Sequence, residues 1–351
     1  MPSKNPSSRK TQRSAVDSII AEICNRRNGR PQHESEWWCV KLSLEEFRSF
    51  EERIQEDEDV YGFFLDKVQY VLPPLFPFSL LTLVSFCPVF THFIRYDYFP
   101  RFSRFVLRYP DNVSEIFKGQ VQTRISQQLF SFRRGQDQQA AEFARKVVGR
   151  GSALNVLKEQ QRHCPDFSYG RYDAGDSGVV IEVSHSHKRV YLPYLANDYI
   201  LGSNGAIRAV IGIDFEYREE KGLEAKVFVW RPKLVEREGV VALEASLTFE
   251  GIFRAADGSL ANGDQTLSIQ LQDFGNKAAC PGIENISGEV MIPFSELHDF
   301  VQMAEEFERR SEALRDLRRS QMLAPGVKRL VGVRPQPGEP DGQVRFQVLE
   351  G

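Results

Sequence analysis

The sequence of 351 residues contains few cysteines and no excess of charge of either sign. Its five cysteines lie far apart and form no C-x-x-C pair, which disfavours a structural zinc site and a dense disulfide framework. Because free thiols are typical of reducing compartments, we expect an intracellular protein, nuclear or cytoplasmic. The 45 Lys and Arg residues balance 48 Asp and Glu residues, so any contact with nucleic acid must be local.

Several loop motifs that carry chemistry are also missing. The GRGS segment at 149–152 lacks the spacing and the trailing lysine of a phosphate-binding P-loop, and GSNG at 202–205 is typical of a helix-to-strand turn. There is no G-x-S-x-G elbow, and no apolar segment follows the basic residues of the first fourteen positions. These absences disfavour nucleotide-driven chemistry, ester hydrolysis by a serine nucleophile and secretion.

One long run without charge covers residues 71–94, VLPPLFPFSLLTLVSFCPVFTHFI. A run of this length would suit a membrane span of about 20 residues. Its prolines break the helical pattern, however, and leave Leu80 to Cys87 as the only clean apolar stretch, which is too short to cross. We therefore expect no membrane partner. We interpret 71–94 as an apolar insertion whose composition is typical of wrongly assigned sequence, such as a translated intron.

Changes in composition divide the chain into segments. Residues 1–33 contain seven Lys and Arg residues against two acids, which is typical of a disordered arm with one short helix at 14–24. The segment PQPGEPDG indicates a flexible end. We predict a disordered basic arm at 1–35, a strand-helix extension at 36–70, the insertion at 71–94, a core at 95–235, a β-plus-long-helix extension at 236–324 and a flexible tail at 325–351.

The core has the periodicities of an α+β fold. Helical spacing with capping residues predicts helices, and alternation with β-branched residues predicts strands. The expected order is α-β-β-β-α-β-β, with helices at 115–129 and 138–148, strands at 153–157, 166–172 and 178–184, a helix at 192–200, and strands at 207–217 and 225–234. Strands at 239–253 and 266–273 continue the sheet region.

A long helix is predicted from Ser295 to about Ala324. One seam of this helix is apolar and consists of Leu297, Phe300, Ala304, Phe307 and Leu314. Such a seam packs either on its own domain or against a second copy of the chain. We favour packing on the same domain and keep self-association through 295–324 as the alternative.

Residues 165–189 are typical of a hairpin that brings two carboxylates together. Two strand-like runs flank a turn of Asp, Gly and Ser residues, and a turn centred on Ala174 places Asp166 opposite Glu182. Directly opposed Cβ atoms in an antiparallel pair lie about 4.5–5.5 Å apart. Glu182 lies among apolar neighbours, where an unpaired charge is costly, so it needs a partner. A hard cation such as Mg²⁺ is one such partner.

Structural alternatives exist for these carboxylates and for their polar neighbours. Asp166 follows a proline and can cap a turn, and Glu182 can pair with Lys188 or Arg208. Three histidines lack further ligands at metal spacing, so we expect them to face solvent or bind the backbone: His163, His185 and His187. Four arginines alternate with aromatic residues, as on the solvated face of a strand: Arg95, Arg101, Arg104 and Arg108.

Pro165-Asp166, and Glu182 in VVIEV sixteen residues after the aspartate, resemble the PD-(D/E)XK motif when taken with the α-β-β-β-α-β order. This motif defines the restriction-endonuclease-like superfamily. The wider stretch from about Trp37 to Glu306, which includes GVVIEVSHSHKR and VFVWRPKL, is similar to a fungal group with that fold. The resemblance covers most of the chain that we expect to be ordered.

The resemblance implies a mixed sheet flanked by helices and a metal-dependent phosphodiesterase that acts on nucleic acid such as DNA. It implies that Asp166 and Glu182 bind Mg²⁺ or Mn²⁺, with the carbonyl of Val183 as a third ligand. It also implies that Glu115, at the start of the first core helix, is an auxiliary acid.

The sequence departs from the family pattern two residues after Glu182. The superfamily has a lysine there that polarises the attacking water, but this chain has Ser184, which carries no charge to stabilise a developing hydroxide. Lys188 is the nearest cation and is our candidate for a migrated catalytic lysine, because Arg189 stays charged and cannot act as a base. The alternative is a degenerate nuclease-fold module that serves as a nucleic-acid-binding or protein-interaction scaffold.

Overall fold

The computed structural model describes residues 14–28, 30–33, 37–56, 95–109, 111–152, 155–156, 161–185, 189–216, 222–276, 282–320, 329–333 and 345–349. The chain forms two compact units, Met1–Glu305 and Glu306–Gly351, and each is described by itself. The insertion predicted at 71–94 and the candidate Lys188 lie outside the described residues. Among the helices in the described ranges, none has both the length and the apolar character that crossing a membrane requires.

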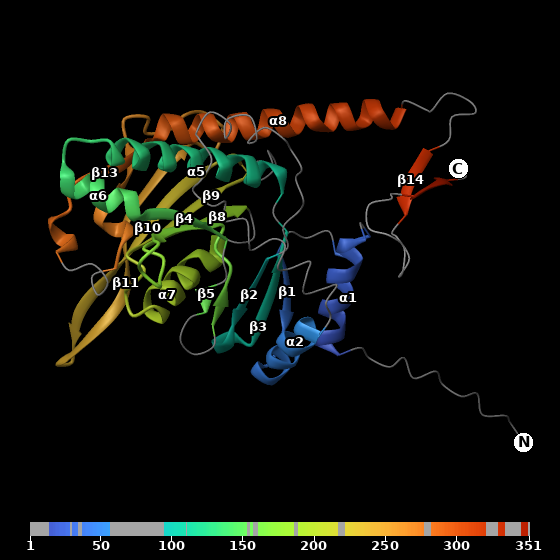
Figure 1. The fold of residues 1–351 in the computed structure, drawn as a ribbon, viewed down its shortest axis with the longest axis horizontal. Helices are drawn as coiled ribbons and strands as arrows, with labels where there is room; N and C mark the ends of the chain where they lie inside the picture. The colour runs from blue at the N-terminus through green and yellow to red at the C-terminus, as the bar shows by residue number, and fades with distance from the viewer. Residues whose placement is uncertain are drawn as a thin grey trace, which may run out of the picture. The chain divides into compact units, whose positions relative to one another are not determined.

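The first unit contains a six-stranded mixed sheet (Figure 1). Its order is β11-β10-β9-β8-β7-β4, and its strands are β4 (Val147–Gly151), β7 (Phe167–Arg171), β8 (Val179–His185), β9 (Ala209–Phe215), β10 (Ala225–Arg237) and β11 (Val240–Arg254). The β8–β9 pair is parallel and the other four pairs are antiparallel. Parallel neighbours need a crossover connection, and helix α7 (Leu192–Gly202) provides it. The fold is therefore mixed α+β, as predicted.

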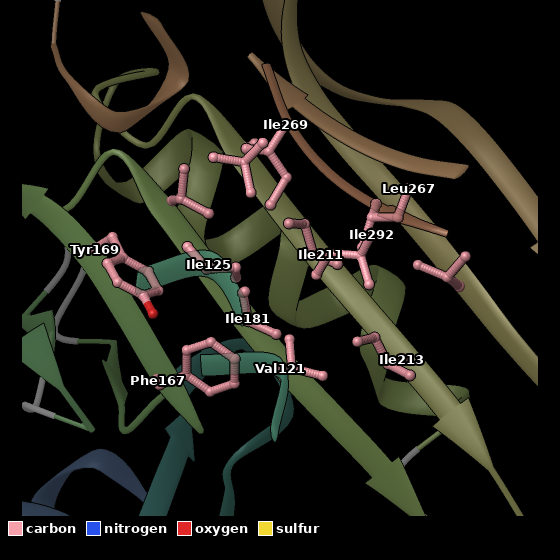
Figure 2. Packing of buried hydrophobic residues seen from close by; sticks show 14 of the residues in the cluster. Val121, Ile125, Phe167, Tyr169, Ile181, Ile211, Ile213, Leu267, Ile269 and Ile292 are labelled. Atoms are coloured by element: carbon pink, nitrogen blue, oxygen red, sulfur yellow. The ribbon is translucent and has the colours of Figure 1, made fainter. Parts of the chain in front are cut away.

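Helices and two further strands cover one face of this sheet. They are α5 (Asn112–Arg133), α6 (Gln138–Lys146), β12 (Thr266–Gln270), β13 (Glu289–Pro293) and the first part of α8 (Phe294–Ser320). Figure 2 shows Ile125 of α5, Ile269 of β12 and Ile211 of β9 gathered in the same buried cluster. The apolar positions of α5 point inward because they recur at helical spacing. The other face packs against α7, where Leu195 and Tyr199 are completely buried.

A second sheet of five strands has the order β1-β3-β2-β6-β5. Its strands are β1 (Trp37–Lys41), β2 (Arg95–Phe99), β3 (Arg104–Arg108), β5 (Asn155–Val156) and β6 (Arg162–His163), and helices α1 (Ala15–Arg27) and α2 (Leu44–Glu56) share its apolar cluster. Ser43 and Glu46 form a capping pair before α2, in which each side chain accepts a hydrogen bond from the main-chain N–H of the other residue. The strand and helix predicted within 36–70 are therefore present. They join residues 95–108 in one sheet, and α1 occupies part of the predicted arm.

One strand and one segment boundary differ from the prediction. The first strand of the large sheet is Val147–Gly151 rather than 153–157, because the chain enters the sheet directly from α6. The core does not end at residue 235, since that position lies within β10 and β11 continues the same sheet. Strand β12 and the start of α8 also belong to the main apolar cluster, so 236–304 completes the core rather than extending it.

The second unit contains a strand pair within the segment predicted as a flexible tail from residue 325. Strands β14 (Arg329–Val333) and β15 (Arg345–Leu349) pair in an antiparallel ladder of five residue pairs. Leu330, Val331 and Val333 are residue types that favour strands, but the proline- and glycine-rich segment between the strands dominated the prediction. In α8, Leu297 and Ala304 are buried in the first unit, whereas Leu314 in the second unit is 57% exposed.

We predict that Gly178→Ala destabilises the protein by about 1–3 kcal/mol. Gly178 precedes β8, and a Cβ atom there would meet the main chain at Asp273 and Phe274, which cannot move as a flexible side chain would. The measurement is urea unfolding followed by circular dichroism. Gly175→Ala, in the same turn with open space around its Cβ position, is the matched control and should change stability little. Equal stability of the two variants would contradict the described packing.

Candidate functional site

The β7–β8 hairpin has the register predicted from its turn. Phe167 pairs with Ile181 and Tyr169 with Val179, which leaves Asp166 one position before the paired strand. The Val183 N–H donates to Asp166 Oδ2 over 2.6 Å. The hairpin backbone therefore holds the Asp166 carboxylate beside the strand that carries Glu182.

Glu182 is buried in β8, with 1% of its surface exposed. The Tyr199 hydroxyl of α7 donates to Glu182 Oε1 over 2.8 Å, and Arg108 Nη1 of β3 donates to Oε2 over 3.1 Å. Burial first, and then the charge of Glu182, raise the pKa of Tyr199 well above its ordinary value, so the phenol stays a donor. Glu182 thus forms an ion pair with Arg108.

Three buried cations surround the two carboxylates. Arg95 of β2 donates to Asp166 Oδ1, and Lys118 Nζ of α5 lies 3.3 Å from the same oxygen. Arg95 and Arg108 are directly opposite each other across the β2–β3 pair, which is unfavourable for like charges unless carboxylates neutralise them. Arg95 and Arg108 are 8% and 5% exposed, so the prediction that they lie on a solvated face was wrong for these two residues.

Glu115 lies at the open side of this cluster. It bonds Lys118, three residues later on the same helix, and its Oε1 is 3.3 Å from Arg95 Nη2. Its side chain is 23% exposed, whereas Lys118 and Arg95 are almost completely buried. The structure therefore places all three described site candidates, Asp166, Glu182 and Glu115, around the same group of cations.

A buried histidine connects the cluster to α7 and the second sheet. His163 Nδ1 is 3.2 Å from Asp97 Oδ1, and its Nε2 is 3.1 Å from Asp198 Oδ2. Burial lowers the pKa of His163, but the hydrogen bonds to Asp198 and Asp97 outweigh it and raise that pKa to about 9. The ring is completely buried, so the expectation of a solvent-facing or backbone-bound His163 is corrected.

Asp97 contacts Arg108 as well as His163. Its Oδ2 lies 3.2 Å from Arg108 Nη1, and its Oδ1 accepts from the Cys164 N–H over 3.2 Å. Arg108 therefore contacts Asp97, Asp166 and Glu182 together. Burial lowers the pKa of Arg108, but the three carboxylates raise it well above its ordinary value.

Ser184, at the position of the family lysine, is completely buried. Within the described part of the chain, its Oγ atom has no hydrogen-bond partner. In the parallel β8–β9 ladder it is paired in register with Asp214, whose carboxylate lies 3.5 Å from Arg189 Nε. Arg189 is therefore held by β9.

The positions of the Asp166 and Glu182 carboxylates show whether the two could bind one divalent cation together. Mg²⁺ binds through one or two carboxylates and completes its shell with water. Here the Arg108 guanidinium lies between the two carboxylates, 3.7 Å from Asp166 Oδ1 and 3.1 Å from Glu182 Oε2. In the described ranges, no group of three or more His, Cys, Asp and Glu residues is placed to hold a metal. The carboxylates therefore do not fit a shared metal ion in this arrangement, because Arg108 takes the bridging place.

Sequence reasoning missed the cations and the histidine of this site. One local signal was available, since Glu115 and Lys118 have the three-residue spacing of neighbours on a helix face. Arg95, Arg108 and His163 had no such signal, because their partners come from distant parts of the chain. No protein-family model matches the chain, and no curated protein matches it. The case for a family therefore depends on the motif residues and their arrangement.

We predict that Arg108→Gln destabilises the protein by about 3–5 kcal/mol, because it leaves buried carboxylates without their cation. The measurement is the free energy of unfolding in urea. Arg104→Gln on the same strand is the matched control, since Arg104 is exposed, and it should change stability by about 0.5 kcal/mol or less. A small effect at Arg108 would contradict a charge cluster that depends on this residue.

We predict that stability falls as the pH rises from about 6.5 to 9. The pKa of His163 is raised on folding, so its contribution is complete below the unfolded value and is lost as the pH passes the folded value of about 9. A shift of this size corresponds to at most about 3 kcal/mol. Unfolding free energies measured across this range should show the fall in the parent and not in His163→Gln. The same pH dependence in both proteins would exclude His163 as its source.

Proposed function

We propose that this chain is a nuclease-fold module of the PD-(D/E)XK type that binds nucleic acid without cleaving it. The order α5-β4-β7-β8-α7-β9 supports the type, since it is the order that the resemblance implies; α6 is added before β4, and β5 and β6 of the second sheet are added before β7. The main evidence for a lack of cleavage activity is the position of Arg108 between Asp166 and Glu182.

Charge balance supports this proposal. The cluster contains the cations Arg95, Arg108 and Lys118 beside the carboxylates of Asp166 and Glu182, with Glu115 at its open side. A buried carboxylate that already accepts from a guanidinium and an N–H or O–H group gains little from a metal ion and would first have to lose those bonds. The ion pairs therefore favour a structural role for Asp166 and Glu182. In an active nuclease of this type, the two carboxylates would bind the metal ion instead.

Ser184 supports the same proposal. A hydroxyl group without charge stabilises a developing hydroxide far less than a lysine does at this position. The described cation nearest to this end of β8, Arg189, is held by Asp214 and cannot act as a base. The chain thus lacks, at the motif position, the group that would polarise an attacking water.

One observation favours a second candidate, the metal-dependent phosphodiesterase that uses Mg²⁺ or Mn²⁺. Lys118 Nζ lies 3.3 Å from Asp166 Oδ1, so a helix supplies an ammonium group beside the carboxylate pair. This lysine, rather than Lys188, would then replace the missing motif lysine. The second candidate requires Arg108 to leave its bridging place between the carboxylates.

Cleavage of labelled single-stranded and double-stranded DNA with Mg²⁺ or Mn²⁺ distinguishes the two candidates. We expect the parent to bind DNA and to leave it intact. Asp166→Asn and Lys118→Met, checked for folding by circular dichroism, should then bind within about twofold of the parent, because the charge cluster is not the binding surface. Metal-dependent cleavage by the parent that both substitutions abolish would overturn the proposal in favour of the phosphodiesterase.

A further inference from the structure

Two exposed aromatic side chains are in contact at the turn between β2 and β3 and the start of α7. Phe102 ends the short 3-10 helix η1 (Pro100–Phe102), and Tyr194 lies in the first turn of α7. Their ring centroids are 5.4 Å apart in an edge-to-face arrangement, and the residues are 52% and 51% exposed. Large aromatic residues exposed together on a surface are typical of a binding site.

Two exposed arginines flank Phe102 in the chain. Arg101 precedes Phe102, and Arg104 follows it by two residues at the start of β3; both arginines are exposed. Arg104 donates to Cys39 Sγ over 3.4 Å, and among the described residues it makes no ion pair with a carboxylate. Its charge is therefore not balanced by a neighbour of opposite charge, unlike the buried arginines of the site.

A series of aromatic rings connects this surface with the charge cluster. The ring centroid of Tyr191, in η3 (Arg189–Tyr191) just before α7, lies 5.2 Å from that of Trp37 in β1 and 6.1 Å from that of Phe99, which precedes η1. The Arg108 guanidinium in turn lies 5.8 Å from the Trp37 ring. The aromatic pair and the charge cluster share their supporting elements. Helix α7 contains Tyr194 of the pair and Tyr199 of the cluster, and η1, which contains Phe102, directly follows β2, which contains Arg95.

We propose that Arg101, Phe102, Arg104, Tyr191 and Tyr194 form an aromatic–arginine surface that binds single-stranded nucleic acid. Bases stack on the exposed rings, and the arginines contact the phosphates. A single strand offers the faces of its bases, whereas a duplex has already stacked them on each other, so this surface favours the single strand. The inference rests on the proposed function, because both require nucleic acid as the ligand.

The exposed charge and the exposed rings together favour single-stranded nucleic acid over other ligands. An acidic peptide would satisfy the arginines but has no flat π face to cover Phe102 and Tyr194. An apolar protein segment would cover the rings but leave Arg104 buried without a carboxylate or phosphate, which is costly. Single-stranded nucleic acid supplies both a π face and a phosphate with every nucleotide.

The test is fluorescence anisotropy with a labelled 12-nucleotide thymidine strand and a 12-base-pair duplex, each titrated with the full chain at several salt concentrations. We expect the single strand to bind more tightly than the duplex. Phe102→Ala and Tyr194→Ala should each weaken binding of the single strand about tenfold through lost stacking. Arg104→Ala should lower the slope of log affinity against log salt by about 0.7, the value for one phosphate contact on a single strand.

Matched controls carry the same changes elsewhere on the surface. Tyr172→Ala removes a ring that is 65% exposed in the β7–β8 turn, and Arg237→Ala removes an arginine whose side chain is 74% exposed. Both should bind within about twofold of the parent. Ring variants that bind like these controls, or a duplex bound as tightly as the single strand, would overturn the inference.

The outcomes also separate this inference from the proposed function. If the parent binds DNA and the variants of the aromatic–arginine surface lose nothing, the inference fails and the proposed function stands. If the parent binds neither form of DNA, both fail. Self-association that these variants abolish, without DNA binding by the parent, would identify the surface as a protein interface and contradict the inference.

Discussion

The contact of Arg108 with three carboxylates is the interaction on which the rest of the site depends. One guanidinium of β3 lies 3.2 Å from Asp97, 3.1 Å from Glu182 and 3.7 Å from Asp166, and 6% of its side chain is exposed. Buried charges are tolerated only when they are paired and hydrogen-bonded. Because Asp97 and Arg108 belong to the five-stranded sheet and Glu182 to the six-stranded sheet, this contact also joins the two sheets.

Helix α7 closes the network from the other side. Its neighbouring residues Asp198 and Tyr199 bind His163 and Glu182, and His163 bonds Asp97 in turn. The chain of contacts thus leads from α7 through both sheets and returns to α7. Burying such a network costs little free energy only when every polar group in it has a partner. The loss of one member leaves the others buried without a partner, which is unfavourable. This explains how polar groups that are typical of an active site can act as structural contacts between two layers.

Local signals were sufficient for part of this site and insufficient for the rest. The turn residues at 173–178 fix the hairpin, so the register that brings Asp166 beside the strand of Glu182 followed from the sequence. The burial of Arg95 and Arg108 did not, because their carboxylate partners are 71 and 74 positions away and an aromatic-basic alternation is equally typical of a solvated strand. The first strand of the large sheet was misplaced for a related reason, since Val147 continues the apolar pattern of α6 and only tertiary pairing with Arg171 makes it a strand.

We propose that Arg108, rather than a divalent metal ion, neutralises Asp166 and Glu182. The decisive measurement is a calorimetric titration of the folded protein with Mn²⁺, with Glu182→Gln as the comparison. We expect no saturable binding of Mn²⁺ by the parent at millimolar concentrations and the same result for the variant. Binding of one Mn²⁺ ion per chain that Glu182→Gln abolishes would contradict it, and would assign the carboxylate pair to a metal site.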